Sequence, residues 1–127
     1  MANETTLFDR TGEATAYVVN ATGNIFLWDG TPAAYLESSR SRMPFSVYGF
    51  NGEHLAWFDG QLMRDHSGGV IAFVRGAVTN VIPRIEPIKS IKKIIPIKRI
   101  KRIEPILPLA RNSFSNQSLQ QLLESGR

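Results

Sequence analysis

The 127-residue chain contains no cysteine, which excludes disulfide bonds, thiolate metal sites and thiol catalysis. It also lacks any run of about 18 apolar residues, so no segment is predicted to span a membrane. The N-terminus has neither the basic start nor the apolar run of a secretory signal, and we therefore predict a cytoplasmic protein.

Candidates for catalysis or metal binding are equally scarce. The chain has two histidines, His54 and His66, and neither has a second ligand at metal-binding spacing. His66 beside Asp65 suits a general base or a metal ligand, but a metal site needs three or four ligands, so we expect a turn or partner contact instead. Asp9 and Asp65 each lie three residues before a repeat glycine (see below), and we interpret them as solubilising charges at strand edges. We predict no catalytic residue, no metal and no cofactor.

Charge divides the chain into two parts. Residues 1–83 carry five arginines against eight acidic residues, a net charge of −3. Residues 84–127 carry ten basic residues against three acidic ones, a net charge of +7. The basic character therefore belongs to the C-terminal part alone, and the two parts are electrostatically complementary.

An internal repeat in the first 77 residues predicts four copies of one β-hairpin. Each copy is centred on a glycine that follows Thr, Asp, Asn or Ser, and Asp-Gly and Asn-Gly are strong signals for a two-residue hairpin turn. Alanine comes four residues after each glycine, and an aromatic residue comes next. The predicted turn glycines are Gly12, Gly30, Gly52 and Gly68, and the predicted repeat-core alanines are Ala16, Ala34, Ala56 and Ala72.

A two-residue turn also predicts which side chains face each other across each hairpin. On one face it pairs a large apolar residue with each alanine: Leu7 with Ala16, Ile25 with Ala34, Val47 with Ala56 and Met63 with Ala72. On the other face it pairs Phe8 with Thr15, Phe26 with Ala33, Tyr48 with Leu55 and Arg64 with Ile71. Because a lone hairpin is marginal in water, the four copies are expected to cover one another's apolar faces around a common centre. An ordinary eight-stranded meander is the alternative.

The tail from Ile82 to Leu109 has an apolar residue at every third position and is interrupted by five prolines. A spacing of three fits neither a helix nor a strand, and the prolines exclude a long helix. The backbone that repeats every three residues and accepts proline is polyproline II. The predicted tail packing edge consists of Ile82, Ile85, Ile88, Ile91, Ile94, Ile97, Ile100, Ile103, Ile106 and Leu109.

This edge predicts that the tail packs against protein, because each aliphatic side chain gains roughly 1.5 to 3 kcal/mol on full burial. A straight polyproline II rod of this length, at about 3.1 Å per residue, would overshoot so small a domain about threefold. The tail therefore either bends back around the hairpins or crosses to neighbouring subunits. Pro87, Pro96 and Pro105 are spaced nine residues apart, which favours stepwise docking.

Two binding alternatives remain open at this point. The tail is dense in cations that suit nucleic acid or an anionic membrane: Lys89, Lys92, Lys93, Lys98, Arg99, Lys101 and Arg102. The regular isoleucines argue against this use. The hairpin aromatics, among them Trp28, Tyr48, Phe50 and Trp57, belong either to the core, which we favour, or to a platform on which a small ligand stacks.

Residues 115–126 predict a short helix with a serine N-cap and a glycine stop. Its Leu119, Leu122 and Leu123 form an apolar face that we expect to dock on the hairpins. The predicted fold is therefore all-β: four β-hairpin repeats (residues 1–77), an extended polyproline II-like Ile/Pro/Lys tail (residues 78–111) and a short C-terminal helix (residues 112–127).

The hairpin sequences Ile-Phe-Leu-Trp-Asp-Gly-Thr-Pro-Ala-Ala-Tyr-Leu and Val-Tyr-Gly-Phe-Asn-Gly-Glu-His-Leu-Ala-Trp-Phe resemble those of the bacterial four-fold beta flower proteins. That family also has a tail of Pro-hydrophobic-Lys units and a Ser- and Leu-rich end, to which Ile-Glu-Pro-Ile-Lys and Asn-Ser-Phe-Ser-Asn-Gln-Ser-Leu are similar here. Phe114 stands where the relatives have tryptophan. The resemblance implies four hairpins about a pseudo-four-fold axis, and it implies no activity.

These observations predict a non-enzymatic structural or protein-interaction module whose basic tail straps onto its own β domain or onto neighbouring subunits. The expected partner is a second copy of the chain, giving a homo-oligomer, or another protein bound through the tail. The alternative is a binding module for a small ligand at the aromatic face, or for nucleic acid or an anionic membrane at the tail. No small-molecule substrate is identified.

Overall fold

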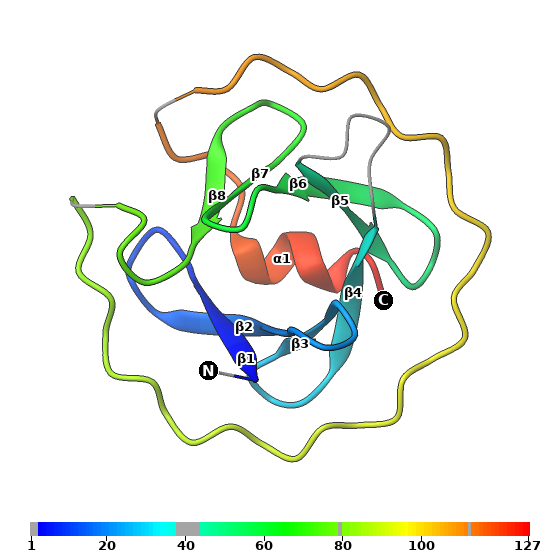
Figure 1. Cartoon of the computed structure of the whole chain (residues 1–127), viewed down its shortest axis with the longest axis horizontal. Coiled ribbons are helices and arrows are strands. Elements are labelled where there is room, and N and C mark those ends of the chain that lie inside the picture. The colour runs from blue at the N-terminus through cyan, green and yellow to red at the C-terminus, as the bar shows by residue number, and fades with distance from the viewer. Residues whose placement is uncertain (1–2, 38–43, 79, 112) are drawn as a thin grey trace.

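The computed structural model describes residues 3–37, 44–78, 80–111 and 113–127. Eight strands form a closed antiparallel barrel in which consecutive strands pair and β1 also pairs with β8 (Figure 1). The elements are β1 (Glu4–Phe8), β2 (Ala14–Val19), β3 (Asn24–Leu27), β4 (Pro32–Glu37), β5 (Phe45–Gly49), β6 (His54–Phe58), β7 (Leu62–Arg64), β8 (Val70–Phe73) and α1 (Leu119–Glu124). The prediction of an all-β fold with one short C-terminal helix is confirmed.

Each repeat glycine lies in a hairpin turn of one type. In the first turn, the amide of Gly12 donates to the carbonyl of Asp9 at 2.9 Å, and the amide of Asp9 donates to the carbonyl of Glu13 at 2.9 Å. The other three turns repeat both bonds, and the four glycines have φ between 84° and 92°. This is a three-residue loop, a type I turn followed by a left-handed glycine. The predicted two-residue turn is therefore wrong, because the bond that closes each loop spans one residue more.

The longer loop changes the register on one face of each hairpin. The predicted pairs of a large apolar residue with alanine are all present, as Leu7 opposite Ala16 illustrates. Beyond them a bulge shifts the register, so that Phe8 lies opposite Ala14 and not Thr15. The other three predicted pairs on that face are wrong for the same reason, and the observed pairs are Phe26 with Pro32, Tyr48 with His54 and Arg64 with Val70.

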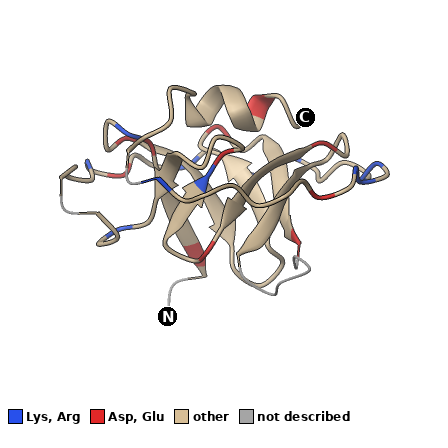
Figure 2. Cartoon of the chain, turned by 90° about the horizontal axis from the view of Figure 1, so that it is seen from above, with Lys and Arg blue, Asp and Glu red and all other residues tan. Residues whose placement is uncertain are grey.

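The core fills the barrel and continues into α1. The four repeat alanines are fully buried at equivalent pairing positions in the barrel core. Helix α1 lies across one end of the barrel (Figure 2), and its Leu119, Leu122 and Leu123 join the same core cluster. The helix begins three residues later than predicted, because the Ser118 hydroxyl accepts the capping hydrogen bond from the amide of Gln121 at 3.1 Å.

Aromatic side chains on the outside of the barrel mark where one hairpin meets the next. We call these four junctions seams 1 to 4. Each contains a cross-strand pair: Tyr17 with Phe26 in seam 1, Tyr35 with Tyr48 in seam 2, Trp57 with Arg64 in seam 3, and Phe73 with Phe8 in seam 4. The rings of seams 1, 2 and 4 are stacked, with centroids 5.6, 6.2 and 5.6 Å apart. Three seams thus present a ring pair, and seam 3 presents a ring and a cation.

Candidate interaction surface: the belt and the barrel seams

Residues 82–111 contain no helix or strand and run around the barrel, so that they enclose it as a belt (Figure 1). Backbone hydrogen bonds attach the belt at all four hairpin turns, and one bond recurs at every turn glycine. The amides of Arg84, Lys93, Arg102 and Arg111 donate to the carbonyls of Gly12, Gly30, Gly52 and Gly68 at 2.8, 2.9, 2.9 and 3.0 Å. The donors are spaced nine residues apart, so one nine-residue unit of the belt serves one hairpin. Of the two paths that the sequence left open, the tail bends back.

The turn glycines are required by the belt as well as by the turns. A Cβ atom on Gly12, Gly30, Gly52 or Gly68 would overlap a belt carbonyl oxygen, that of Ile82, Ile91, Ile100 or Leu109 respectively. Gly60 and Gly76 also have positive φ, yet a Cβ atom there would meet nothing within 4 Å. The repeat glycines therefore combine two constraints, backbone conformation and close approach of a second chain segment.

Lysines of the belt cover the ring pairs of seams 1 and 2. The Lys89 Nζ lies 4.8 Å from the centroid of the Tyr17 ring and 5.0 Å from that of Trp28. The Lys98 Nζ lies 4.1 Å from the centroid of the Tyr35 ring. Such cation–π contacts are each worth about 0.5 to 2 kcal/mol, and more where water is excluded. The belt and the aromatic layer thus stabilise each other.

Ion pairs reinforce the same contacts. The Glu4 carboxylate of β1 pairs with Lys89 at 2.8 Å and Lys92 at 2.6 Å, and their hydrogen bonds hold the pKa of Glu4 below its usual value. Lys101 pairs with Glu37 at 2.8 Å. Basic belt residues therefore face acidic barrel residues, as the charge division of the sequence suggests.

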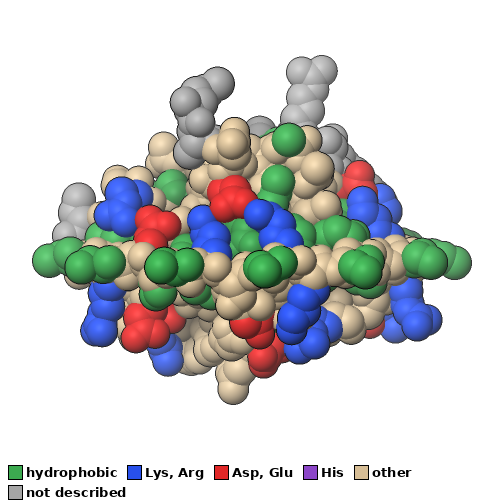
Figure 3. Space-filling model, turned by 90° about the horizontal axis from the view of Figure 1, so that it is seen from below, with side chains coloured by type: hydrophobic (Ala, Val, Ile, Leu, Met, Phe, Trp, Pro, Cys, Tyr) green, Lys and Arg blue, Asp and Glu red, His purple; other side chains and the backbone are tan. Residues whose placement is uncertain are grey.

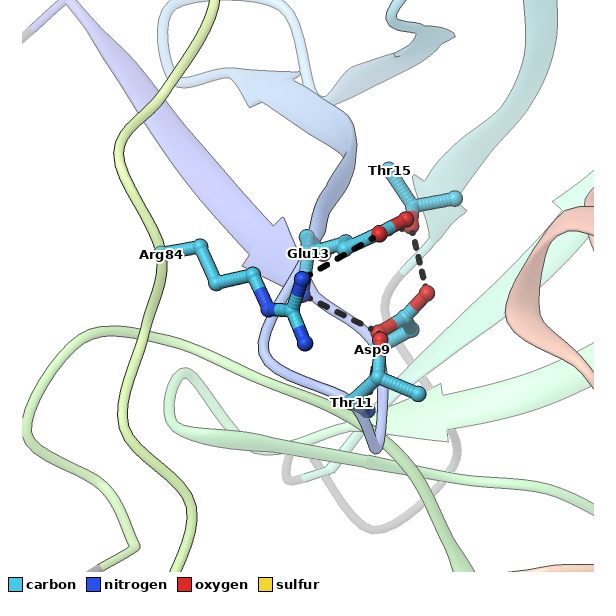
Figure 4. A network of polar contacts seen from close by, with 5 residues as sticks. All are labelled: Asp9, Thr11, Glu13, Thr15 and Arg84. Carbon is cyan, nitrogen blue, oxygen red and sulfur yellow. Dashed lines mark hydrogen bonds and ion pairs between the residues drawn. The ribbon is translucent and has the colours of Figure 1, made fainter.

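The first turn shows how one unit of the belt is held (Figure 4). Arg84 reaches from the belt toward Glu13, with their charged groups 3.8 Å apart. The Asp9 carboxylate accepts hydrogen bonds from the Thr11 amide at 2.9 Å and from the Thr15 hydroxyl at 3.1 Å. The turn is thus closed by hydrogen bonds of its own, separate from the contact with the belt.

Most candidate polyanion contacts are used inside the molecule. Lys89, Lys92 and Lys98 contact barrel rings or Glu4, Lys101 contacts Glu37, and Arg102 pairs with Glu53 at 2.8 Å. Lys93 lies 3.4 Å from the Thr31 hydroxyl, and the backbone amide of Arg99 donates to the Phe50 carbonyl at 2.8 Å. Five of the seven side chains therefore have a barrel ring or carboxylate as partner.

The isoleucine edge points away from the barrel. Its ten side chains are 82 to 97% exposed, and hydrophobic side chains line the rim of the molecule with charged side chains above and below them (Figure 3). Of the two packing surfaces left open for this edge, the chain's own β domain does not cover it. The belt contacts the barrel through its backbone and its charged side chains, so the isoleucine edge faces outward. Ile95, outside the three-residue series, is the least exposed isoleucine of the belt, at 37%.

Three of the four aromatics considered for a platform are covered. Tyr48, Phe50 and Trp57 are at most 5% exposed, because neighbouring barrel side chains and the belt pack around them. Of the rings considered for stacking, Trp28 is partly exposed, and its Nε1 donates to the Pro87 carbonyl of the belt at 3.2 Å. The core interpretation therefore holds for the three buried rings.

A chain of polar contacts that the sequence analysis missed links the belt to two turns. The buried Ser46 hydroxyl contacts Glu104 of the belt and lies 3.2 Å from Nε2 of His54. Nδ1 of His54 lies 2.9 Å from Nε2 of His66. Burial and the neighbouring His66 lower the pKa of His54 to about 4. Both histidines flank repeat glycines at one end of the barrel, which was the available signal that closure would bring them together.

We compared the sequence with models of known protein families. The family model described as a 4-fold beta flower protein matches residues 5–123. The chain belongs to the 4-fold beta flower family. The match includes the belt and most of α1, so the family pattern is the barrel together with its belt. Searches of curated proteins and of solved structures find no match.

The two aspartates of this beta flower chain have a role other than the one predicted. Asp65 is buried and accepts hydrogen bonds from the Ser67 amide at 3.0 Å and from the Ser115 hydroxyl, while Asp9 serves the first turn as described. They stabilise turns, because a carboxylate two residues before an amide closes a local ring. Among the described residues, no three His, Asp or Glu side chains are grouped to hold a metal ion. Within the same residues, no helix has the length and hydropathy needed to cross a bilayer.

Proposed function

We propose that this beta flower protein is a non-enzymatic protein-interaction module whose belt presents its isoleucine edge to neighbouring copies of the chain. The observation that carries the proposal is the exposure of ten aliphatic side chains along one rim. At roughly 1.5 to 3 kcal/mol each, their full burial would supply about 15 to 30 kcal/mol. Large exposed apolar side chains in such number mark interaction sites in soluble proteins.

The way the belt is attached supports the same use. Because each nine-residue unit is bonded to a turn glycine, and belt cations such as Lys89 and Lys101 pair with barrel carboxylates, the isoleucines form a fixed array. The spacing of three between outward side chains favours a polyproline II backbone for the belt. The four similar hairpins favour a pseudo-four-fold axis, so that equivalent arcs of the rim offer equivalent contacts to several copies.

Binding of a polyanion is the weaker candidate, because most of the belt cations already contact the barrel. An anion would have to compete with Glu4, Glu37 and Glu53 for the same ammonium and guanidinium groups. Association through isoleucine predicts little dependence on salt, whereas phosphate contacts predict a steep one. Salt dependence therefore separates the two functions.

The test replaces Ile94, Ile97 and Ile100 together with serine and measures mass in solution by sedimentation at two salt concentrations. These three side chains are at least 92% exposed in the single chain, so the serine variant should still fold, and its thermal midpoint should fall only by the part that association contributes. We expect the unchanged protein to form oligomers at both salt concentrations and the serine variant to dissociate.

The matched control replaces the same three residues with valine, which keeps the apolar edge. Valine should retain the oligomer. A monomeric natural protein, or a serine variant that associates as strongly as the valine variant, would remove the basis for the proposal. Salt-sensitive binding of DNA or anionic vesicles by the serine variant would favour the polyanion function.

A further inference from the structure

Seam 3 departs from the pattern of the other three seams. The residue four before the glycine is Phe8, Phe26 or Tyr48 in three hairpins and Arg64 in the fourth. The belt changes at the same place. Lys89 and Lys98 are followed, nine residues later, by Leu107 instead of a third lysine. Likewise, Lys92 and Lys101 are followed by Ala110. In seams 1 and 2, two belt lysines thus correspond to a pair of aromatic rings. In seam 3, Leu107 and Ala110 take the place of the lysines, and Trp57 and Arg64 take the place of the rings.

These substitutions leave a pocket between barrel and belt. It has a volume of about 150 Å³, and its walls include Trp57, Leu62, Leu107 and Pro108. An apolar cavity of about this volume is large enough to hold benzene. Arg64 and Asp59 line the same pocket, so an apolar space lies beside a guanidinium and a carboxylate.

We propose that this pocket binds a small carboxylate whose apolar group is about the size of a benzene ring. The apolar group would lie against Trp57 and Leu107, and the carboxylate would contact Arg64. The proposal is independent of the isoleucine edge, which faces away from the barrel.

The state of Arg64 favours an anionic ligand. Its Nε is buried and has no hydrogen-bond partner among the described residues. Its Nη1 is 3.8 Å from Oδ2 of Asp59, which is longer than a hydrogen bond. The other oxygen, Oδ1, accepts from the amides of Gln61 and Leu62 at 2.9 and 2.7 Å, so the turn holds one oxygen of Asp59 while Oδ2 faces Arg64. The guanidinium therefore has spare donors in the planar arrangement that a carboxylate matches.

The experiment follows the indole signal of Trp57 by nuclear magnetic resonance while benzoate is added to the full chain. We expect a saturable shift at Trp57 and none at Trp28, which lies at a different seam. Benzamide has the same shape without the charge, and it should bind at least about tenfold more weakly, since charge-assisted hydrogen bonds are the strong ones. Arg64→Met should reduce benzoate affinity by a similar factor.

Two belt substitutions provide a matched pair that does not depend on Arg64. Ala110→Phe fills the pocket from the belt side and should abolish the shift, whereas Ile106→Phe places the same ring on the exposed rim and should leave benzoate binding unchanged. The proposal is overturned by a linear, unsaturable response, by equal affinity for benzamide and benzoate, or by full binding in the Ala110→Phe variant.

Discussion

Replacement of Gly52 by alanine tests whether the belt is an integral part of the fold. Gly52 has φ +92°, and a Cβ atom there would overlap the Ile100 carbonyl oxygen of the belt. The left-handed conformation alone costs a non-glycine residue about 1 to 2 kcal/mol. The overlap adds to this, because the belt must move and the hydrogen bond from the Arg102 amide to Gly52 would be lost at about 0.5 to 1.5 kcal/mol.

Gly60 provides the matched control. Its φ is +95°, and a Cβ atom there would meet nothing within 4 Å. Gly60→Ala therefore carries the conformational cost without the belt contact, and the difference between the two variants isolates docking of the belt. We expect Gly52→Ala to lower the free energy of unfolding by about 1 to 3 kcal/mol more than Gly60→Ala.

The measurements are urea unfolding of both variants and hydrogen exchange at the Arg102 amide. In the unchanged protein that amide should be protected, and Gly52→Ala should abolish the protection while Gly60→Ala leaves it intact. If the two variants unfold at the same urea concentration and exchange Arg102 equally slowly, the belt does not depend on the turn glycines and the reasoning fails.

Two further predictions concern the barrel. Ala56→Leu places a larger side chain at a fully buried position opposite Val47 and should cost about 1 to 3 kcal/mol by overpacking; an unchanged urea midpoint would show that the centre has spare room. Because the pKa of His54 is lowered from 6.5 to about 4 in the folded protein, the unfolded state binds more protons between those values. The free energy of unfolding should therefore fall as pH drops from about 6.5 to 4, by at most about 3 kcal/mol. His54→Gln should flatten that part of a urea-midpoint profile, and an equally steep profile would place the titration elsewhere.

The hairpins were predictable because the information that specifies them is local and repeated. A glycine at a fixed distance from an alanine specifies one hairpin, and four copies reveal which positions are equivalent even where single residues differ. The same locality explains the error in the turn. Asp29-Gly30 occurs in both two-residue and three-residue loops, and the choice depends on whether Leu27 bonds to Thr31 across the turn, which the dipeptide does not encode.

The direction of the isoleucine edge was not predictable from hydropathy. Burial of aliphatic side chains is the usual rule, and Ile94 at 94% exposed departs from it. The cause is the shape of the contact: the belt approaches the turns so closely at Gly30 and Gly52 that only backbone fits between them. The His54 and His66 contact was missed because it joins two hairpins: the repeat places each histidine near a turn glycine but does not say which hairpins lie next to each other.

The one-to-one match between nine-residue units and hairpins makes the belt a length gauge for the barrel. A chain that gained or lost one hairpin without gaining or losing nine belt residues would place Arg102 or Arg111 away from its glycine carbonyl. Changes in the two halves of the sequence are therefore coupled in fixed proportion, although the halves share no motif. A barrel with more or fewer hairpins would need a matching insertion or deletion in the belt. The number of hairpins and the number of nine-residue belt units must therefore change together.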